Sequence, residues 1–385
     1  MARHSPELRD ARFPANEIIS LLDVNRRFNL AESTSQDLTL GEVLDLAGVE
    51  QIRSLKLGYG SSSGRLALRE AIARHCGVSA DQVLTTQGTV LGLYLLATEL
   101  CRAGDEAVLA TPCFPPTRDA LIGSGVDVRT VPLRFDQGYR LDVERMVSAM
   151  SPRTRLVSIA SPQNPSGVRT DRSTVERLLD TMKERAPDAF LFVDETYRDA
   201  IYGDAETPRS MAAIDPRVVT GASVSKAHGA PGLRTGWLTV ADIGLLARLK
   251  TAKMNVVISG STLDETLAAV VLTRGEAVLA PRRRLLARAL AELASWHSGE
   301  AHRLDWVRPD GGALCCMRLA PHAFDDGTVR RFWEVLPALE LQLASGRWFG
   351  EEDRVFRLGF GYLPEAELAP ALAAVSRAMD AALAG

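Results

Sequence analysis

Between roughly residues 60 and 260 the sequence alternates short apolar runs with amphipathic segments, and this alternation restricts the possible folds strongly. Stretches with helical periodicity include residues 64–75, 91–100 and 172–183. The intervening runs have the length and composition of buried strands, and they cover residues 107–110, 156–160, 189–193 and 218–222. Strand–helix alternation of this kind predicts an α/β domain with a mainly parallel sheet.

The C-terminal part of the sequence has a different pattern and predicts a smaller α+β domain. Its expected elements are a helix, two strands and a closing helix, at residues 281–297, 312–319, 355–360 and 365–383. The segment before residue 50 is expected to join this smaller domain. The expected division is therefore a large domain at 50–280 and a small domain made of 1–49 and 281–385.

Lys226 is the first candidate for chemistry, because it follows one of the predicted buried strands. Ligands of open parallel sheets bind beyond the carboxyl ends of the strands. A lysine at such a position has an anchored stem and can be desolvated, which lowers its pKa and frees its amine as a nucleophile. Arg234 follows eight positions later, past a Gly/Pro turn, and can return to the same cleft as a permanent cation for a phosphate. The alternative for a lone lysine is a solvated surface charge.

The residues around Lys226 resemble a known motif. Ser223-Val224-Ser225-Lys226, followed by Gly232-Leu233-Arg234-Thr235-Gly236, is similar to the lysine motif of the class I/II (fold type I) aminotransferases. Enzymes of this family use pyridoxal 5′-phosphate (PLP) and have a large PLP-binding domain. The resemblance implies that Lys226 holds PLP as a Schiff base, with Ser223, Ser225 and Arg234 also binding the cofactor. It extends from about Leu57 to Phe360.

A carboxylate and a phenol three residues apart follow the run 189–193. In the family, such a carboxylate keeps the pyridine nitrogen protonated, so that the ring can absorb electrons from a substrate carbanion. The phenol donates to the ring hydroxyl. The resemblance assigns these roles to Asp194 and Tyr197. The alternative for Asp194 is a helix N-cap.

Three further matches imply cofactor contacts. Asn164, in Asn164-Pro165-Ser166-Gly167, matches the family's Asn-Pro-Thr-Gly motif and would bond the ring oxygen and a substrate carboxylate oxygen. Gly88, Thr89 and Val90 open an apolar helix, whose free N–H groups suit a phosphate. Phe114 matches the aromatic residue that stacks on the pyridine ring. Plain turns, an N-cap threonine and a core aromatic are the alternatives.

Two matches concern the substrate and a second subunit. Arg357 lies among apolar residues of a predicted strand, and in the family this arginine clamps the substrate α-carboxylate. The alternative is a structural ion pair. Tyr59 matches a tyrosine that reaches the phosphate of the neighbouring subunit in relatives. This match implies a homodimer.

The sequence departs from the family where many relatives have a glycine-containing loop against the substrate. Here the segment is Asn29-Leu30-Ala31-Glu32-Ser33-Thr34. A carboxylate at Glu32 could pair with a basic substrate side chain, such as that of arginine or ornithine. The alternative is that Glu32 caps a local turn. His228, two residues after the lysine, has no assigned role.

The resemblance implies transfer of an amino group from an amino acid to a 2-oxo acid, with Lys226 moving the proton at Cα. The same motifs also serve lyases, cyclases and oxidases, so the alternative is an enzyme that acts on one amino acid, with basic amino acids among the candidates. A PLP-binding transcription regulator would need a fused helix-turn-helix domain, for which the sequence has no spare segment.

Charge and cysteine content narrow the expected partners. The net charge of −3 gives no reason to expect nucleic acid or an anionic membrane. The five cysteines show no metal-ligand spacing, so no metal is expected, and their odd number favours a reducing compartment. The N-terminus has no signal-peptide pattern, and no apolar run reaches transmembrane length. A cytoplasmic location is expected.

Overall fold

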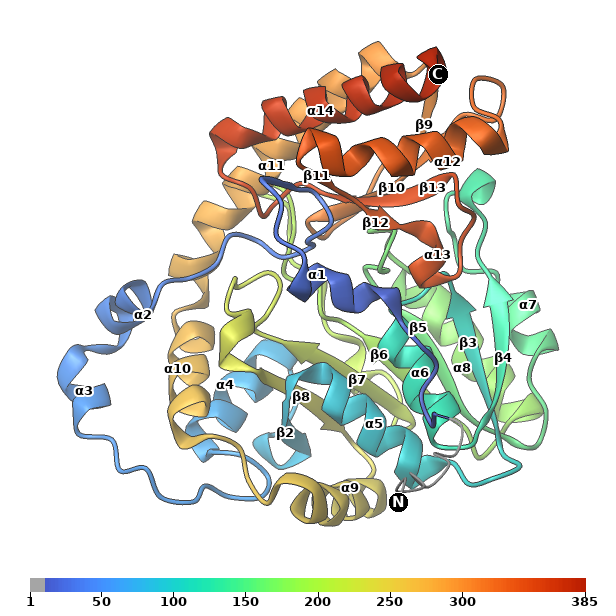
Figure 1. Cartoon of the computed structure of the whole chain (residues 1–385). Helices are drawn as coiled ribbons and strands as arrows, with labels where there is room; N and C mark the ends of the chain where they lie inside the picture. The colour runs from blue at the N-terminus through green and yellow to red at the C-terminus, as the bar shows by residue number, and fades with distance from the viewer. Residues whose placement is uncertain (1–10) are drawn as a thin grey trace, which may run out of the picture.

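The computed structural model describes residues 11–385, which form two main sheets with helices packed around them (Figure 1). The larger sheet has seven strands in the order β2-β8-β7-β6-β5-β3-β4. All neighbouring pairs are parallel except those that involve β8. The strands are β2 (Val83–Gln87), β3 (Glu106–Thr111), β4 (Asp127–Pro132), β5 (Thr154–Ala160), β6 (Phe190–Asp194), β7 (Val218–Ser223) and β8 (Thr235–Val240).

Both faces of this sheet are buried by helices, which explains why its strands are nearly continuous apolar runs. Alternate residues of a strand point to opposite faces. On β3, Ala107 packs in a cluster with α5 (Gly88–Leu100) and α9 (Ile243–Val257). Val108 packs in another cluster with α7 (Val143–Ser148) and α8 (Arg172–Arg185). The remaining helices around this sheet are α4 (Leu66–Cys76), α6 (Pro115–Gly123) and α10 (Thr262–Thr273).

The smaller sheet is antiparallel, in the order β12-β13-β10-β9. One face packs against the C-terminal helices, with Met317 and Phe356 in that core. Cys316 and Arg357 face each other in the register and point to the opposite face, toward the larger sheet. The elements are α11 (Gly275–Glu300), β9 (Leu304–Val307), β10 (Leu314–Leu319), α12 (Asp326–Val335), β12 (Ala344–Ser345), α13 (Gly346–Phe349), β13 (Val355–Gly359) and α14 (Glu365–Ala384).

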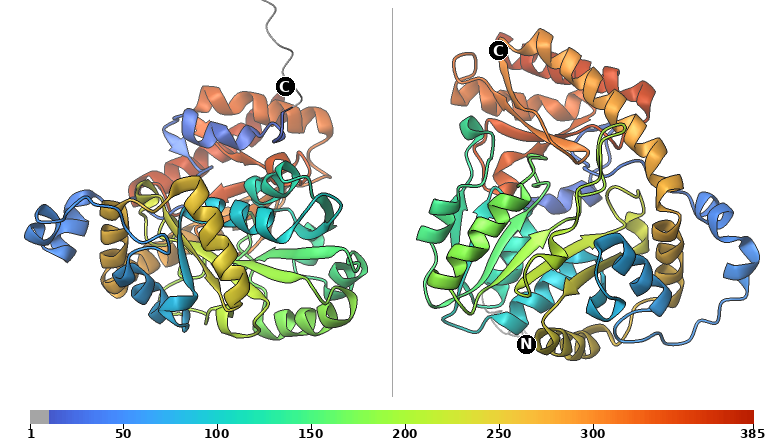
Figure 2. Two further views of the ribbon diagram at one scale, coloured as in Figure 1. Left: turned by 90° about the horizontal axis from the view of Figure 1, so that it is seen from below. Right: turned by 180° about the vertical axis from the view of Figure 1, so that it is seen from behind.

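The N-terminal segment joins the part of the molecule that contains the smaller sheet. Strand β1 (Phe28–Asn29) pairs with β11 (Leu341–Gln342), and Gly359 N–H donates to the carbonyl of Leu30 at 2.7 Å. The chain then runs outward through α2 (Leu40–Ala47) and α3 (Val49–Arg53), which stand away from the body of the molecule (Figure 2). The short helix α1 (Ser20–Asp23) precedes β1.

The structure confirms the α/β fold with a mainly parallel sheet and the strands predicted near residues 107, 156, 189 and 218. The helix predicted to begin at Pro281 begins at Gly275 instead. The buried side chains of Val278 and Leu279 hold this first part of the helix, and this packing outweighs the poor helix propensity of proline. The division at residues 50 and 280 stays a prediction.

Residues 11–385 contain no helix with both the length and the hydrophobicity that crossing a membrane requires.

Gly359 is expected to tolerate no side chain, because a Cβ atom there would overlap the carbonyl oxygen of Glu32. Gly359→Ala should lower the free energy of unfolding by about 1–3 kcal/mol, since main-chain atoms must move to make room. Gly275→Ala is the matched control, because a Cβ at that position meets no atom within 4 Å. Urea denaturation that shows equal stability for the two variants would contradict this close approach.

Candidate active site

The carboxyl ends of the central strands lie side by side at one edge of the large sheet. Ala160 on β5 pairs with Asp194 on β6, and Asp194 pairs with Gly221 on β7. Lys226 and Asn164 lie in the connections just beyond β7 and β5. The strand-end rule therefore brings together Lys226, Asp194 and Asn164, which are far apart in the sequence.

A cradle for an anion lies where β2 turns into α5. Gly88 adopts a left-handed conformation with a φ of 73°, and a Cβ there would lie 2.7 Å from Nη2 of Arg234. The hydroxyl of Thr89 is buried, and no hydrogen bond reaches it within residues 11–385. Gly236 allows β8 to pass close to the N-terminus of α5, because a Cβ atom at this position would lie 2.6 Å from the main-chain nitrogen of Thr89. A cation, an unpartnered hydroxyl and a helix N-terminus thus meet at one point.

The other residues predicted for the phosphate fit this cradle to different degrees. Ser223 and Ser225 are buried at the end of β7, where the N–H of Ser225 donates to Oγ of Ser223 at 3.3 Å. Val90 is 40% exposed, so its contribution is expected from the main chain rather than from the side chain. Free N–H groups, a guanidinium and hydroxyls suit the phosphate of PLP.

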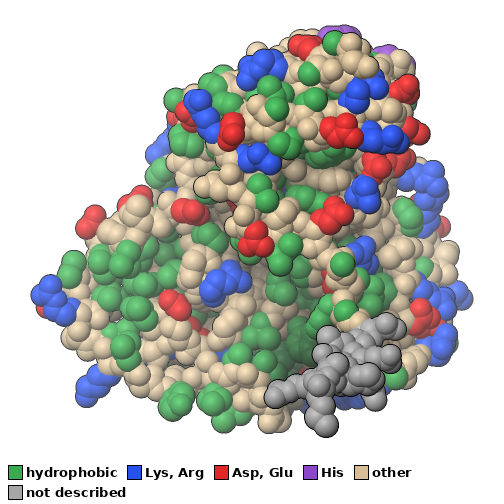
Figure 3. All heavy atoms as spheres, viewed as in Figure 1, with side chains coloured by type: hydrophobic (Ala, Val, Ile, Leu, Met, Phe, Trp, Pro, Cys, Tyr) green, Lys and Arg blue, Asp and Glu red, His purple; other side chains and the backbone are tan. Residues whose placement is uncertain are grey.

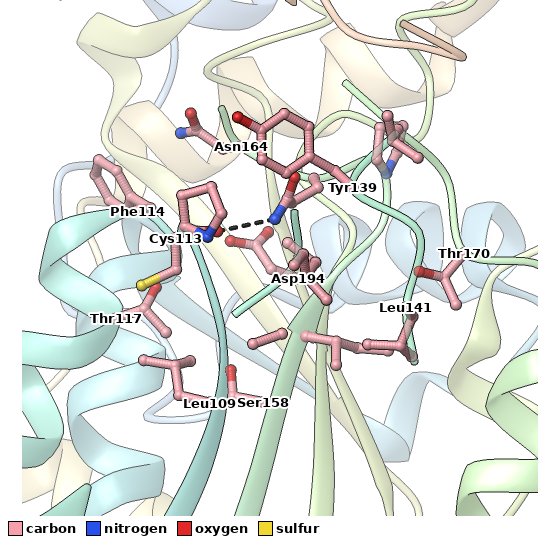
Figure 4. Close-up of a pocket in the computed structure, with 18 of the residues that line it drawn as sticks. Leu109, Cys113, Phe114, Thr117, Tyr139, Leu141, Ser158, Asn164, Thr170 and Asp194 are labelled. Atoms are coloured by element: carbon pink, nitrogen blue, oxygen red, sulfur yellow. Dashed lines mark hydrogen bonds between the residues drawn. The ribbon is translucent and has the colours of Figure 1, made fainter. Parts of the chain in front are cut away.

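Asp194 lies in a buried environment in which a bound cation would stabilise its carboxylate. Burial raises its pKa, although the hydrogen bonds from Thr196 and the charge of Lys226 oppose this effect. Within the described residues it forms no ion pair, and its Oδ1 accepts the N–H of Thr196 at 2.9 Å. A protonated pyridine nitrogen would supply the missing charge. Figure 4 shows Asp194, Phe114 and Asn164 around one cavity.

Lys226 is held by two neighbours from the N-terminal segment. Its Nζ donates to Oε1 of Glu32 and to Oγ of Ser33, at 3.2 Å each. The hydroxyls of Ser33 and Tyr197 are 2.9 Å apart. Oε1 of Glu32 also accepts the N–H groups of Ser33 at 2.7 Å and Thr34 at 3.1 Å. Glu32 therefore caps a local turn and contacts the lysine at the same time.

The prediction of a lowered pKa for Lys226 is wrong. Burial alone would lower the pKa of Lys226, but the electrostatic interactions with Tyr197 and with the Glu32 carboxylate outweigh burial and raise it. For Glu32, burial would raise the pKa, and the positive charges of Lys226 and Arg357 together with the Ser33 N–H lower it. No local sequence pattern indicates that the carboxylate of Glu32 reaches the lysine.

Arg357 is a buried cation at the centre of the site, and it is 1% exposed. Its Nη1 donates to Oδ1 of Asn164 at 2.9 Å and its Nη2 to the carbonyl of Ala31 at 2.5 Å. The guanidinium lies 4.8 Å from the ring centre of Phe349. No carboxylate within residues 11–385 forms an ion pair with it, and its Nε has no hydrogen-bond partner there. The alternative of a structural ion pair is therefore not observed.

The predicted residue Tyr59, and His228, which had no assigned role, lie outside this constellation. Tyr59 is 88% exposed on the segment between α3 and α4, so its own subunit does not bring it to the site. His228 is buried against His75, with ring centres 6.2 Å apart, and burial lowers its pKa to about 4. Sequence reasoning missed Ser33, because nothing in the local pattern links residue 33 to Tyr197 or Lys226.

Within residues 11–385, a lysine, a carboxylate without an ion pair, an anion cradle and an arginine without an ion pair meet at one buried sheet edge, as expected for a PLP-dependent enzyme of fold type I. Residues 28–375 match the family model described as aminotransferase class I and II. The chain belongs to this family. Its cofactor is PLP and its reaction class is amino-group transfer.

Individual relatives have two kinds of activity. A capreomycidine synthase of Streptomyces vinaceus is 30% identical over 90% of this chain and 88% of its own length. An arginine–pyruvate transaminase of Pseudomonas aeruginosa is 29% identical over 71% of each chain. Among solved structures, a PLP-dependent aminotransferase from Streptococcus suis has a TM-score of 0.87 at 23% identity and covers 96% of this chain and 98% of its own. The structure of a PLP-dependent cyclase has a TM-score of 0.86 at 24% sequence identity. The match covers 98% of this chain and 99% of the cyclase chain.

Borohydride treatment of the PLP-loaded protein is expected to fix the cofactor on the peptide that contains Lys226, as peptide mass spectrometry would show. Lys253 is the chemical rival, because it is fully buried on α9 and burial lowers its pKa to about 8. Its Nζ contacts Thr85 at 3.3 Å instead of the site. Lys253→Met should keep the label and Lys226→Ala should lose it. A reducible imine that persists in Lys226→Ala would contradict the assignment.

Proposed function

We propose that the residues at this sheet edge hold PLP and carry out transamination of an α-amino acid with a 2-oxo acid. One observation carries the proposal: Arg357, a buried cation that forms no ion pair with a carboxylate of residues 11–385, lies in one constellation with Lys226 and Asp194. A site that offers one cation for a carboxylate and one amine for a carbonyl matches the two functional groups that all amino acids and 2-oxo acids share.

Each cofactor group has residues that would hold it. Lys226 would attach PLP covalently, Asp194 would bond the pyridine nitrogen, and Phe114 would cover the ring. Tyr197 and Asn164 would bond the ring oxygen. The phosphate would be bound by Gly88, Thr89, Val90, Ser223, Ser225 and Arg234.

The remaining chemistry is carried by the chain itself. When bound, PLP supplies an electron sink for the negative charge that develops at the substrate Cα. Arg357 binds the substrate carboxylate through two N–H groups and so fixes the orientation of Cα. Asn164 already accepts a hydrogen bond from Arg357 and would bind a second oxygen of the same carboxylate. Nζ of Lys226 accepts the proton that leaves Cα and later gives it up.

Glu32 supports a basic amino acid as donor. Its Oε1 is occupied by Ser33, Thr34 and Lys226, whereas no hydrogen bond from residues 11–385 reaches its Oε2. A carboxylate held in place with one free oxygen favours a cationic side chain and disfavours an aliphatic one, because an unpaired charge in a desolvated pocket is costly. An arginine–pyruvate transaminase is among the relatives.

A second candidate function is cyclisation, elimination or oxidation of a single amino acid without an acceptor. Two observations support it: the 30% identity with a capreomycidine synthase over 90% of the chain and the fold shared with a PLP-dependent cyclase. The residues that hold PLP, the carboxylate and the Cα proton are common to both candidates. Dependence of the reaction on a 2-oxo acid separates them.

A homodimer would complete the site with Tyr59 of the partner subunit. Tyr59 projects from the segment after α2 and α3, where it is 88% exposed. Leu40, Leu57, Leu66 and Leu263 are also exposed in this region. Figure 3 shows hydrophobic side chains gathered on this side of the molecule. A contact between two copies would cover these apolar side chains. We also propose that residues 50–280 form one domain and 1–49 with 281–385 the other, with the site between them.

A panel of amino donors, each with and without pyruvate or 2-oxoglutarate, tests both candidates. Arginine, ornithine and lysine are expected to outrank leucine and phenylalanine in kcat/KM, and turnover should require the acceptor. Glu32→Ala should narrow the difference between basic and aliphatic donors about tenfold or more, the effect of one charge-assisted hydrogen bond.

The ranking of donors, rather than kcat/KM for any one donor, decides the question. Glu32 also contacts Lys226, so replacing Glu32 is expected to change kcat/KM for every donor. Asp37→Ala is the matched control, since it removes an exposed carboxylate of the same segment. A cyclic or eliminated product formed without acceptor would favour the second candidate. An unchanged ranking of amino donors in Glu32→Ala would contradict a role of Glu32 in substrate selection.

A further inference from the structure

Four side chains form a continuous hydrogen-bonded chain beside the reactive amine. The hydroxyl of Tyr197 lies 2.9 Å from Oγ of Ser33, and Oγ accepts an N–H of Lys226 at 3.2 Å. Lys226 donates a second N–H to Glu32 at 3.2 Å. Ser33 and Tyr197 are 2% and 4% exposed, so the chain is shielded from water on the side of these two residues. Two of its four members come from a segment almost 200 residues away from the lysine in the sequence.

Hydrogen bonds to the main chain hold the segment that carries Glu32 and Ser33 in place. Oδ1 of Asn29 accepts the N–H groups of Ala31 and Glu32, at 3.1 Å each. The N–H of Ser35 donates to the carbonyl of Lys226 at 3.1 Å, so the main chains of the two segments are joined next to the amine. On the other side, Gly359 donates to Leu30. Backbone contacts on both sides hold the Glu32 carboxylate within reach of Nζ.

Several ionisable groups face the Lys226 amine. Glu32 and Tyr197 favour its protonated form, and Arg357 opposes it. Asp194 lies close enough for the lysine to lower its pKa, and the exposed Asp37 is affected by both Glu32 and Lys226. Within residues 11–385, Glu32 is the carboxylate that forms an ion pair with the lysine.

We propose that Glu32, together with Ser33, is a positioning residue that fixes the Lys226 amine and controls how readily it loses its proton. An ammonium group must lose one proton before its nitrogen can attack a carbonyl carbon. When a proton moves from Nζ to Oε1, the products are a neutral amine with a free electron pair and a neutral carboxylic acid, so charge and protons balance. The inference rests on the proposed function only in taking Lys226 as the reactive amine.

The cofactor-free protein provides the test. Pulsed acetylation with acetic anhydride from pH 6 to 11, followed by peptide mass spectrometry, measures the reactivity of Lys226, with exposed Lys56 as the internal reference. Glu32→Gln keeps an oxygen for the N–H groups of Ser33 and Thr34 but removes the charge. Its Lys226 should titrate at lower pH and react about tenfold faster below neutrality, the change that one pKa unit produces.

Two variants distinguish control of the lysine from simple turn capping. Asp37→Asn removes the same charge from the same segment without touching Nζ, and it should change the labelling less than about twofold because exposed charges are screened. Glu32→Asp should restore part of the wild-type profile.

If Glu32 only caps the turn, Glu32→Gln and wild type will have the same labelling profile, and the proposal fails. If Glu32→Gln does not fold, Ser33→Ala replaces it, because that change removes one acceptor of the Lys226 amine and should also shift the profile. Since no substrate or cofactor is present, this result is independent of donor ranking and of the reaction that the loaded enzyme performs.

Discussion

A buried arginine, Arg357, that forms no ion pair with any carboxylate in the described part of the chain is the constraint on which the site depends. Transfer of a guanidinium out of water is costly, and the two neutral oxygens and the ring of Phe349 that contact Arg357 compensate only in part. An anion that binds there gains the interaction the protein leaves unsatisfied. Strand β13 carries this cation on the face of the small sheet that points toward the large sheet. The proposed substrate site therefore lies between the two sheets.

The contacts of Arg357 also couple the parts of the molecule. Asn164 comes from the large sheet, Ala31 from the N-terminal segment, and Arg357 from the small sheet. The same N-terminal segment places Glu32 and Ser33 against Lys226. A ligand that draws the guanidinium toward itself competes with the hydrogen bonds to Asn164 and Ala31. Carboxylate binding would thus be linked to the geometry around the amine through one segment, whose Ala31 contacts Arg357 and whose Glu32 and Ser33 contact Lys226.

The parts of this site that sequence could predict are those governed by local rules. Buried strands are readable as apolar runs, and their ends locate Lys226 and Asp194 because parallel strands share one functional edge. The contact between Glu32 and Lys226 depends on how residues 28–35 lie against β13, and no local pattern encodes that pairing. For the same reason the lysine pKa was predicted in the wrong direction. Burial is visible in the sequence, whereas an opposing charge that arrives from 194 residues away is not.

The central claim is that Arg357 awaits a substrate carboxylate, and a calorimetric titration of the PLP-loaded enzyme tests it most directly. A 2-methyl amino acid, which lacks the Cα proton and so cannot react further, is compared with its methyl ester. Wild type should bind the acid about 100-fold more tightly, the contribution of a charge-assisted bidentate pair, and Arg357→Gln should abolish this preference. An equal preference for the acid in both proteins would contradict the account.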